Sequence, residues 1–220
     1  MSQQLIHVYF MPGMCASSKI FEYIKLPENQ FKIHYLEWII PLENETIEAY
    51  ALRMTEYVKN DNVVLLGVSF GGVLVQEMAK LINVKKLIIV SSVKTEEELP
   101  KRMKVAKLTK VYKLLPTQLV INIDMLAKYA FGKSVVKRIE LYEKYLTVKD
   151  SNYISWAIKQ MICWNQENHD PEIVHIHGGK DMVFPINNIK NCIVLENGTH
   201  IMIINKYKWF NENLPKLILT

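Results

Sequence analysis

The chain has 220 residues, of which 50% are hydrophobic and 22% are charged, a composition that fits one folded domain and excludes a disordered or fibrous protein. No window reaches the roughly 18 apolar residues that a membrane span needs, and residues 1–7 lack the basic and apolar regions of a secretory signal. The cysteines, Cys15, Cys163 and Cys192, are far apart, so neither a disulfide framework nor a zinc site is expected. Free thiols without a signal predict a cytoplasmic protein.

The net charge of +5 is concentrated in one segment, because residues 94–150 carry thirteen Lys and Arg against seven Asp and Glu. Lysines there recur every third residue with hydrophobic residues between them, which predicts one helix with a lysine face: Lys101, Lys104, Lys107, Lys110 and Lys113. A solvated face explains this pattern most simply, and attraction of anionic substrates or of an acidic surface is the alternative. Nucleic-acid binding is not expected, because no recognised module accompanies the charge.

Short apolar runs alternate with amphipathic stretches along the first 94 residues. We predict strands at 5–10, 31–36, 63–68 and 86–90, and helices at 17–23, 45–59 and 70–82. This alternation is typical of parallel strands joined by helices. Residues 63–68 are nearly all apolar, as in a strand that is buried on both faces.

The alternation stops after the fourth strand. Residues 95–164 are predicted to be helical, and strands resume at 173–176 and 192–195 before a last helix at 206–217, interrupted near Pro215. The sequence therefore predicts an α/β fold: a mainly parallel sheet of about six strands flanked by helices, with a helical cap inserted after the fourth strand. The core would comprise residues 1–94 and 165–220, and the cap residues 95–164.

The segment Gly67-Val68-Ser69-Phe70-Gly71 follows a predicted buried strand and opens a predicted helix. A GxSxG pattern in that setting indicates a sharp strand-to-helix turn that exposes a nucleophilic serine hydroxyl. A Cβ at either glycine is expected to crowd the neighbouring strand and helix. We predict Ser69 as the nucleophile; a glycine-rich turn with a helix-capping serine is the plain alternative.

A nucleophilic serine needs a base, and the base needs an orienting acid. Asp181 and His200 each follow a predicted strand, in the chain order Ser, acid, His that is typical of such sites. The other histidines lie inside predicted strands or in a polar linker. Three glutamates after the fourth strand rival Asp181 as the acid, although they look like first-turn helix residues: Glu96, Glu97 and Glu98.

Two backbone amides are predicted to form an oxyanion hole. The residue after the nucleophile, Phe70, provides one, and the loop after the first strand provides the other. In that loop Gly13 is expected to let the backbone turn towards the site, which makes the Met14 amide the candidate. A plain strand-to-helix loop is the alternative.

Four segments of this chain together resemble the α/β-hydrolase superfamily. They are the Pro12-Gly13 loop, the turn at Ser69, the His-Gly-x-x-Asp run ending at Asp181, and Thr199-His200. The resemblance covers nearly the whole chain outside residues 95–164. It implies a sheet with a helical cap and hydrolysis of an ester or related acyl bond, with no cofactor or metal. Many members have His-Gly where this chain has Pro12-Gly13, and their first two strands look absent here. The short gap from Asp181 to His200 predicts a reduced helix between the last two strands.

Several substrates stay open at this point. Aromatic and Met residues are plentiful in and after the cap, which favours a small apolar acyl ester as substrate: Tyr112, Met125, Tyr129, Phe131, Tyr142, Tyr145, Tyr153, Trp156, Met161 and Trp164. A carboxylesterase is the first interpretation and an acyl thioesterase, supported by the basic cap, is the second. A non-hydrolytic ligand-binding protein or a lyase on the same scaffold is the third.

Overall fold

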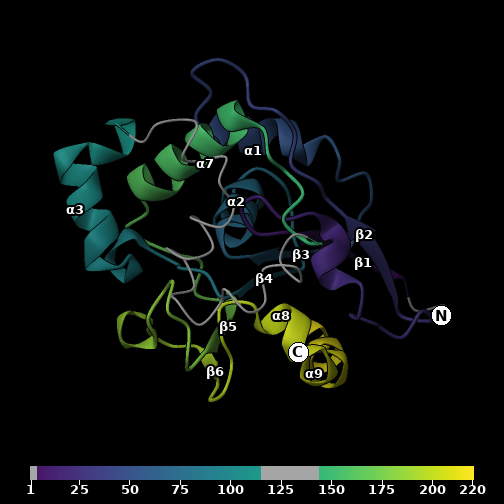
Figure 1. Ribbon diagram of the computed structural model, residues 1–220. Helices are drawn as coiled ribbons and strands as arrows, with labels where there is room; N and C mark the ends of the chain where they lie inside the picture. Colours follow the sequence, from purple (N-terminus) through teal and green to yellow (C-terminus); the bar gives the residue numbers. More distant parts are fainter. Residues whose placement is uncertain (1–3, 115–143) are drawn as a thin grey trace.

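The computed structural model describes residues 4–114 and 144–220 (Figure 1). Within them, six parallel strands form one sheet in the order β2-β1-β3-β4-β5-β6. The strands are β1 (Ile6–Met11), β2 (Phe31–Tyr35), β3 (Val63–Val68), β4 (Lys86–Val90), β5 (Val174–Gly178) and β6 (Ile193–Leu195). The predicted fold class is therefore confirmed.

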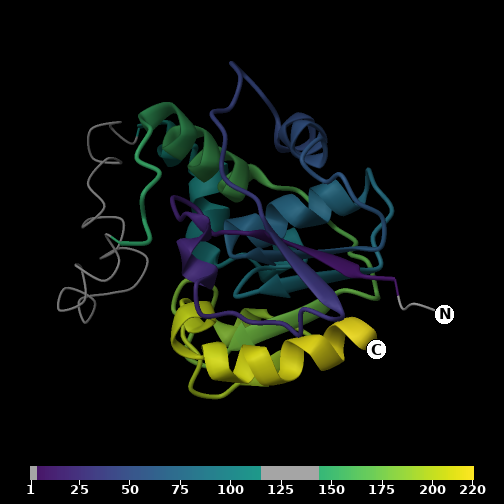
Figure 2. The ribbon, with the colours of Figure 1, turned by 90° about the vertical axis from the view of Figure 1, so that its right-hand side faces the viewer.

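Helices cover both faces of the sheet (Figure 2). One face packs against α1 (Ile47–Thr55), α2 (Phe70–Ala79) and α7 (Ser151–Cys163), and the other against η1 (Ser18–Phe21), α8 (Met202–Asn205) and α9 (Tyr207–Leu219). Along β1 the side chains alternate, since Tyr9 and Met11 join the first core and Val8 and Phe10 the second. Because both faces are covered, the central strand β3 is apolar and buried along its whole length.

The described part of the connection from β4 to β5 consists of helical elements joined by turns and irregular segments. It contains η2 (Glu96–Glu98), α3 (Lys101–Thr109), η3 (Val111–Leu114) and α7. The domain boundaries at 95 and 164 stay predictions. Four of the aromatic and Met residues on which the substrate prediction rests lie outside the described residues: Met125, Tyr129, Phe131 and Tyr142.

The prediction of one continuous lysine face is wrong. Helix α3 ends at Thr109, because Lys110 adopts a left-handed conformation with φ 56°, and η3 then starts in a new direction. Lys104 donates to the Glu97 carbonyl and Lys107 pairs with Glu96. The row is thus split, and two of its lysines bind the turn that precedes the helix.

Two predicted helices also differ from those observed. At 17–23 the structure has only η1, because a segment of seven residues closes more readily with i→i+3 bonds. The last helix, in contrast, runs through Pro215 to Leu219. Leu214 and Ile218 are fully buried against the sheet, so packing outweighs the hydrogen bond that Pro215 cannot donate.

The link between β5 and β6 contains only the short η5 (Ile186–Asn188) among its regular elements, which confirms the predicted reduction of that helix. Among residues 4–114 and 144–220, no helix is long and apolar enough to cross a membrane. The cytoplasmic location stays a prediction.

Candidate active site

The site lies where the strand order reverses. The chain moves from β1 outward to β2, then crosses to β3 and continues outward on the other side. In open α/β sheets, ligands bind beyond the carboxyl ends of the strands at such a switch point. The loop with Gly13 follows β1 and Ser69 follows β3, so the two predicted halves of the site flank this point.

Ser69 occupies a strained turn between β3 and α2. Its φ of 54° and ψ of −122° lie outside the conformations that residues with a Cβ favour, at a cost of about 1–3 kcal/mol. The Ser69 amide donates to the Val90 carbonyl, and the Ser92 hydroxyl donates to the Ser69 carbonyl at 2.7 Å. Hydrogen bonds from both sides therefore hold the serine in this conformation.

The flanking glycines allow three backbone segments to approach one another. A Cβ on Gly67 would lie 2.2 Å from the Gly71 carbonyl oxygen, and one on Gly71 would lie 2.3 Å from the Pro12 carbonyl oxygen. Both distances are far below van der Waals contact. The predicted crowding at both glycines is thus confirmed, and it links the turn at Ser69 to the loop after β1.

His200 lies between Ser69 and Asp181. Its Nε2 is 2.9 Å from the Ser69 hydroxyl oxygen, and its Nδ1 is 2.8 Å from Asp181 Oδ2. Asp181 is buried and His200 is 9% exposed. The structure therefore brings together the three side chains that the sequence analysis selected, from loops after β3, β5 and β6.

Asp181 is fixed by the turn that follows it. Its Oδ1 accepts hydrogen bonds from the Val183 amide at 2.8 Å and the Phe184 amide at 2.9 Å, which leaves Oδ2 for His200. Burial alone would raise the pKa of Asp181, but the charge and hydrogen bond of His200, together with the Phe184 amide, hold it below its ordinary value. Asp181 is thus a carboxylate that orients His200.

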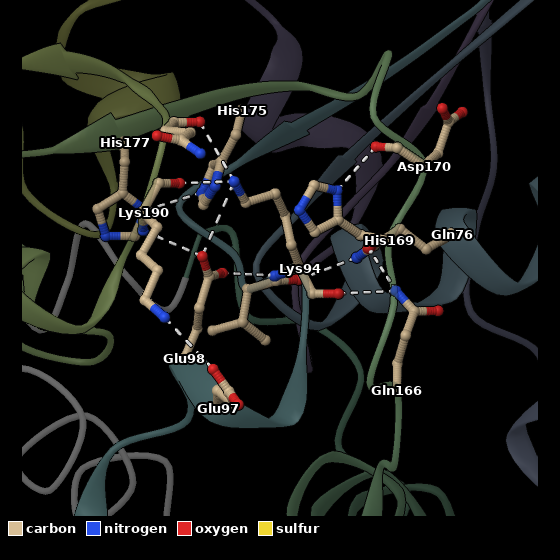
Figure 3. A network of polar contacts seen from close by, with 12 residues as sticks. Gln76, Lys94, Glu97, Glu98, Gln166, His169, Asp170, His175, His177 and Lys190 are labelled. Carbon is tan, nitrogen blue, oxygen red and sulfur yellow. Dashed lines mark hydrogen bonds and ion pairs between the residues drawn. The ribbon is translucent and has the colours of Figure 1, made fainter.

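The rival acids lie elsewhere. Glu98 is buried and accepts hydrogen bonds from the Lys94 and Lys190 amides, and it also lies 3.8 Å from the Lys94 ammonium (Figure 3). That ammonium donates to the Lys190 carbonyl. Glu98 therefore ties the segment after β4 to the loop before β6, and Glu96 and Glu97 pair with lysines.

Two further histidines, His175 and His177, are buried in β5. Burial lowers the pKa of both rings, and for His175 the neighbouring His177 and Lys94 add to the effect. His177 Nε2 lies 2.8 Å from the Phe184 carbonyl, so this nitrogen carries the proton, because a carbonyl can only accept. His175 Nε2 lies 3.1 Å from His177 Nδ1 and therefore donates to it when His177 is neutral.

The loop after β1 lies against the serine. A Cβ on Gly13 would lie 3.4 Å from the Ser69 Cβ, which is ordinary contact, and Gly13 does not have a left-handed φ. Gly13 therefore has no backbone conformation that only glycine can adopt, and the role of the Met14 amide stays a prediction. Phe70 is the first residue of α2, so both candidate oxyanion amides, those of Met14 and Phe70, belong to segments that contact Ser69 directly.

Sequence reasoning missed two side chains that hold this loop. The Trp38 indole donates to the Gly13 carbonyl, and the Tyr153 hydroxyl accepts from the Cys15 amide. Trp38 follows β2 and Tyr153 lies on α7, and no motif spacing links either residue to the loop. The sequence points to Tyr153 only as one of several aromatic residues in and after the predicted cap.

Comparison with solved structures identifies the architecture. An esterase from Exiguobacterium antarcticum superposes with a TM-score of 0.71 over 100% of this chain and 94% of its own, at 20% sequence identity. The chain has the α/β-hydrolase fold.

Other solved structures with this α/β-hydrolase fold differ in the activity that their names state. A hydrolase from Pseudomonas aeruginosa PA01 has a TM-score of 0.71, covering 98% of this chain and 91% of its own at 11% identity. An epoxide hydrolase from Bacillus megaterium has a TM-score of 0.68, covering 100% and 95% at 12% identity. No protein-family model and no curated protein matches the sequence. The function must therefore be argued from the site.

Proposed function

We propose that this protein is a serine hydrolase that cleaves small carboxylic esters through an acyl-enzyme intermediate. The observation that carries the proposal is the hydrogen-bonded chain from Ser69 through His200 to Asp181, with distances of 2.9 and 2.8 Å. Such a chain activates a serine hydroxyl, because the histidine can accept its proton and the carboxylate stabilises the imidazolium that results.

In the first half of the reaction, the Ser69 oxygen bonds to the ester carbonyl carbon while its proton passes to His200 Nε2. The carbonyl oxygen takes up the negative charge and accepts hydrogen bonds from the Met14 and Phe70 amides. The intermediate then expels the alcohol, which receives the proton from His200. In the second half, water gives a proton to His200 and its oxygen bonds to the acyl carbon; the bond from that carbon to the Ser69 oxygen then breaks, His200 returns the proton to Ser69, and the carboxylic acid leaves.

The substrate proposal rests on the surroundings of the site. Aromatic residues lie beside the site: the ring centroid of Phe184 lies 5.5 Å from that of His200, and the sequence of the cap segment is rich in aromatic and Met residues. Aromatic and apolar surroundings of this kind favour short to medium hydrophobic acyl groups. The esterase from Exiguobacterium antarcticum supports ester cleavage by analogy of fold.

A steady-state screen tests this proposal. We expect turnover of p-nitrophenyl esters with a preference for apolar acyl chains, and loss of that turnover in Ser69→Ala. Acyl thioesters of the same chain lengths serve as the comparison, because the basic segment 94–150 favours a thioesterase as the second candidate. Equal turnover of charged and apolar acyl esters would contradict the substrate class, and turnover unchanged in Ser69→Ala would contradict the mechanism.

A further inference from the structure

One peptide unit in the loop after β1 joins Gly13 to Met14. The Trp38 indole N–H donates to its carbonyl oxygen at 2.8 Å, and the Ala16 amide donates to the same oxygen at 3.0 Å. The described chain contains no cis peptide bond. In a trans peptide the C=O and the following N–H lie in one plane and point in opposite directions. The hydrogen bond from Trp38 therefore also sets the direction of the Met14 N–H.

Trp38 contacts the second candidate oxyanion residue as well. Its ring stacks on the Phe70 ring, with centroids 5.2 Å apart and an interplanar angle of 11°. The side chain is 8% exposed and is further enclosed by Tyr50 and Tyr153. A single rigid indole thus spans the two segments whose amides the oxyanion would need, one after β1 and one after β3.

The cap segment holds the same loop from another side. Tyr153 of α7 accepts a hydrogen bond from the Cys15 amide at 3.3 Å, and the Val148 amide donates to the Cys15 carbonyl at 3.0 Å. Cys15 has a φ of 64°, which a residue with a side chain adopts only when its surroundings enforce it. The loop beyond Met14 is therefore anchored by Tyr153 and Val148, whereas Trp38 is the side chain that holds the peptide before Met14.

We propose that Trp38 is a positioning residue that sets the geometry of the oxyanion hole by fixing the Gly13–Met14 peptide against Phe70. The inference rests on the proposed hydrolase function, because the hole has a role only if Ser69 attacks a carbonyl. Trp38 acts through the Met14 amide and does not contact the reacting atoms itself. Its loss therefore weakens stabilisation of the transition state more than binding of the substrate.

The test compares Trp38→Phe with a matched variant, Trp156→Phe. Trp156 is also 8% exposed, also contacts the Phe70 ring, and also donates its indole N–H to a backbone carbonyl, that of Glu45, at 2.8 Å. The Glu45 carbonyl keeps a second donor, Gln160, as the Gly13 carbonyl keeps Ala16. The two variants thus lose the same kind of bond, and only one of these bonds fixes the peptide before Met14.

The measurement is kcat for a p-nitrophenyl ester per active site, with sites counted by prolonged titration with a fluorophosphonate. Loss of one oxyanion donor costs on the order of 10²–10³-fold in kcat, and a displaced donor costs less. We expect Trp38→Phe to lower kcat per site roughly 10- to 100-fold relative to Trp156→Phe. KM should stay within about threefold, and the pH midpoint of kcat/KM should not move, because the contacts of His200 are unchanged.

Equal kcat per site in the two variants, or a change confined to KM, would overturn the role of Trp38. If Trp38→Phe does not fold, β-(3-benzothienyl)alanine at position 38 removes the N–H with little change of shape, and the same substitution at position 156 is its control. If the fluorophosphonate titrates Ser69 in the wild type but the two variants have equal kcat per site, this inference alone is refuted. Wild type that is not titrated, or is titrated equally in Ser69→Ala, refutes both this inference and the proposed function.

Discussion

The substitution Asp181→Asn changes one atom and has a large expected effect. Two backbone amides, those of Val183 and Phe184, donate to Asp181 Oδ1, so an asparagine must keep its carbonyl oxygen there and turn its NH₂ group towards His200. His200 Nδ1 then has to accept, which leaves the ring proton on Nε2, the atom 2.9 Å from the Ser69 hydroxyl. A protonated Nε2 cannot take up the serine proton.

A histidine held in the wrong tautomer costs a serine hydrolase about 10⁴-fold in kcat, or about 5 kcal/mol in activation free energy. The assay is kcat for a p-nitrophenyl ester near pH 8. Asp170→Asn is the control, since Asp170 is exposed and its Oδ1 also accepts a backbone amide, that of Glu172; it should keep full activity. A loss of less than tenfold in Asp181→Asn would refute the assigned role of Asp181.

Three other expectations concern stability. His175 and His177 have lowered pKa values in the folded protein, so the unfolded chain binds more protons than the folded one below about pH 6.5. The free energy of unfolding should therefore fall on acidification by up to about 1.4 kcal/mol per pH unit for each ring. Urea titrations from pH 7.5 to 5.5 should show a shallower fall in His175→Gln than in the wild type, and an equal fall would count against this assignment. Ser69→Gly should raise the free energy of unfolding by about 1 kcal/mol while abolishing turnover, because the positive φ no longer opposes a Cβ; a lower melting temperature would contradict the strain. Gly71→Ala should lower the free energy of unfolding by several kcal/mol or fail to fold, because its Cβ would lie 2.3 Å from a backbone oxygen. Gly13→Ala should fold, because its Cβ would lie 3.4 Å from the nearest atom. Thermal unfolding distinguishes the two variants, and similar midpoints would argue against the close approach at Gly71.

The parts of the fold that hydrophobic periodicity controls were predictable. The strands β3 and β4 match their predicted bounds because each is a short apolar run between polar turns. The candidate site was predictable for a different reason. Ser69, Asp181 and His200 each follow a strand of one parallel sheet, and the carboxyl ends of such strands share an edge. Placing residues after strands was therefore enough to bring them together.

Features that depend on tertiary contacts were not predictable. Helix α9 continues past Pro215 because Leu214 and Ile218 are buried, and burial is not visible in a local helix signal. The lysine row breaks at Lys110, which adopts a left-handed conformation. The sequence does not indicate this helix end, because the position is not occupied by glycine, the residue that most often adopts this conformation. The hydrogen bond from Trp38 to Gly13 joins residues 25 positions apart, and neither residue belongs to a motif that would pair them.

The central claim is that Ser69 is a nucleophile activated by His200, and covalent labelling tests it most directly. The protein is treated with a fluorophosphonate and digested, and the modified peptide is located by mass spectrometry. The account predicts one adduct per chain, on Ser69, with no labelling in Ser69→Ala and strongly slowed labelling in His200→Ala. An adduct on another residue, or labelling that persists in Ser69→Ala, would contradict it.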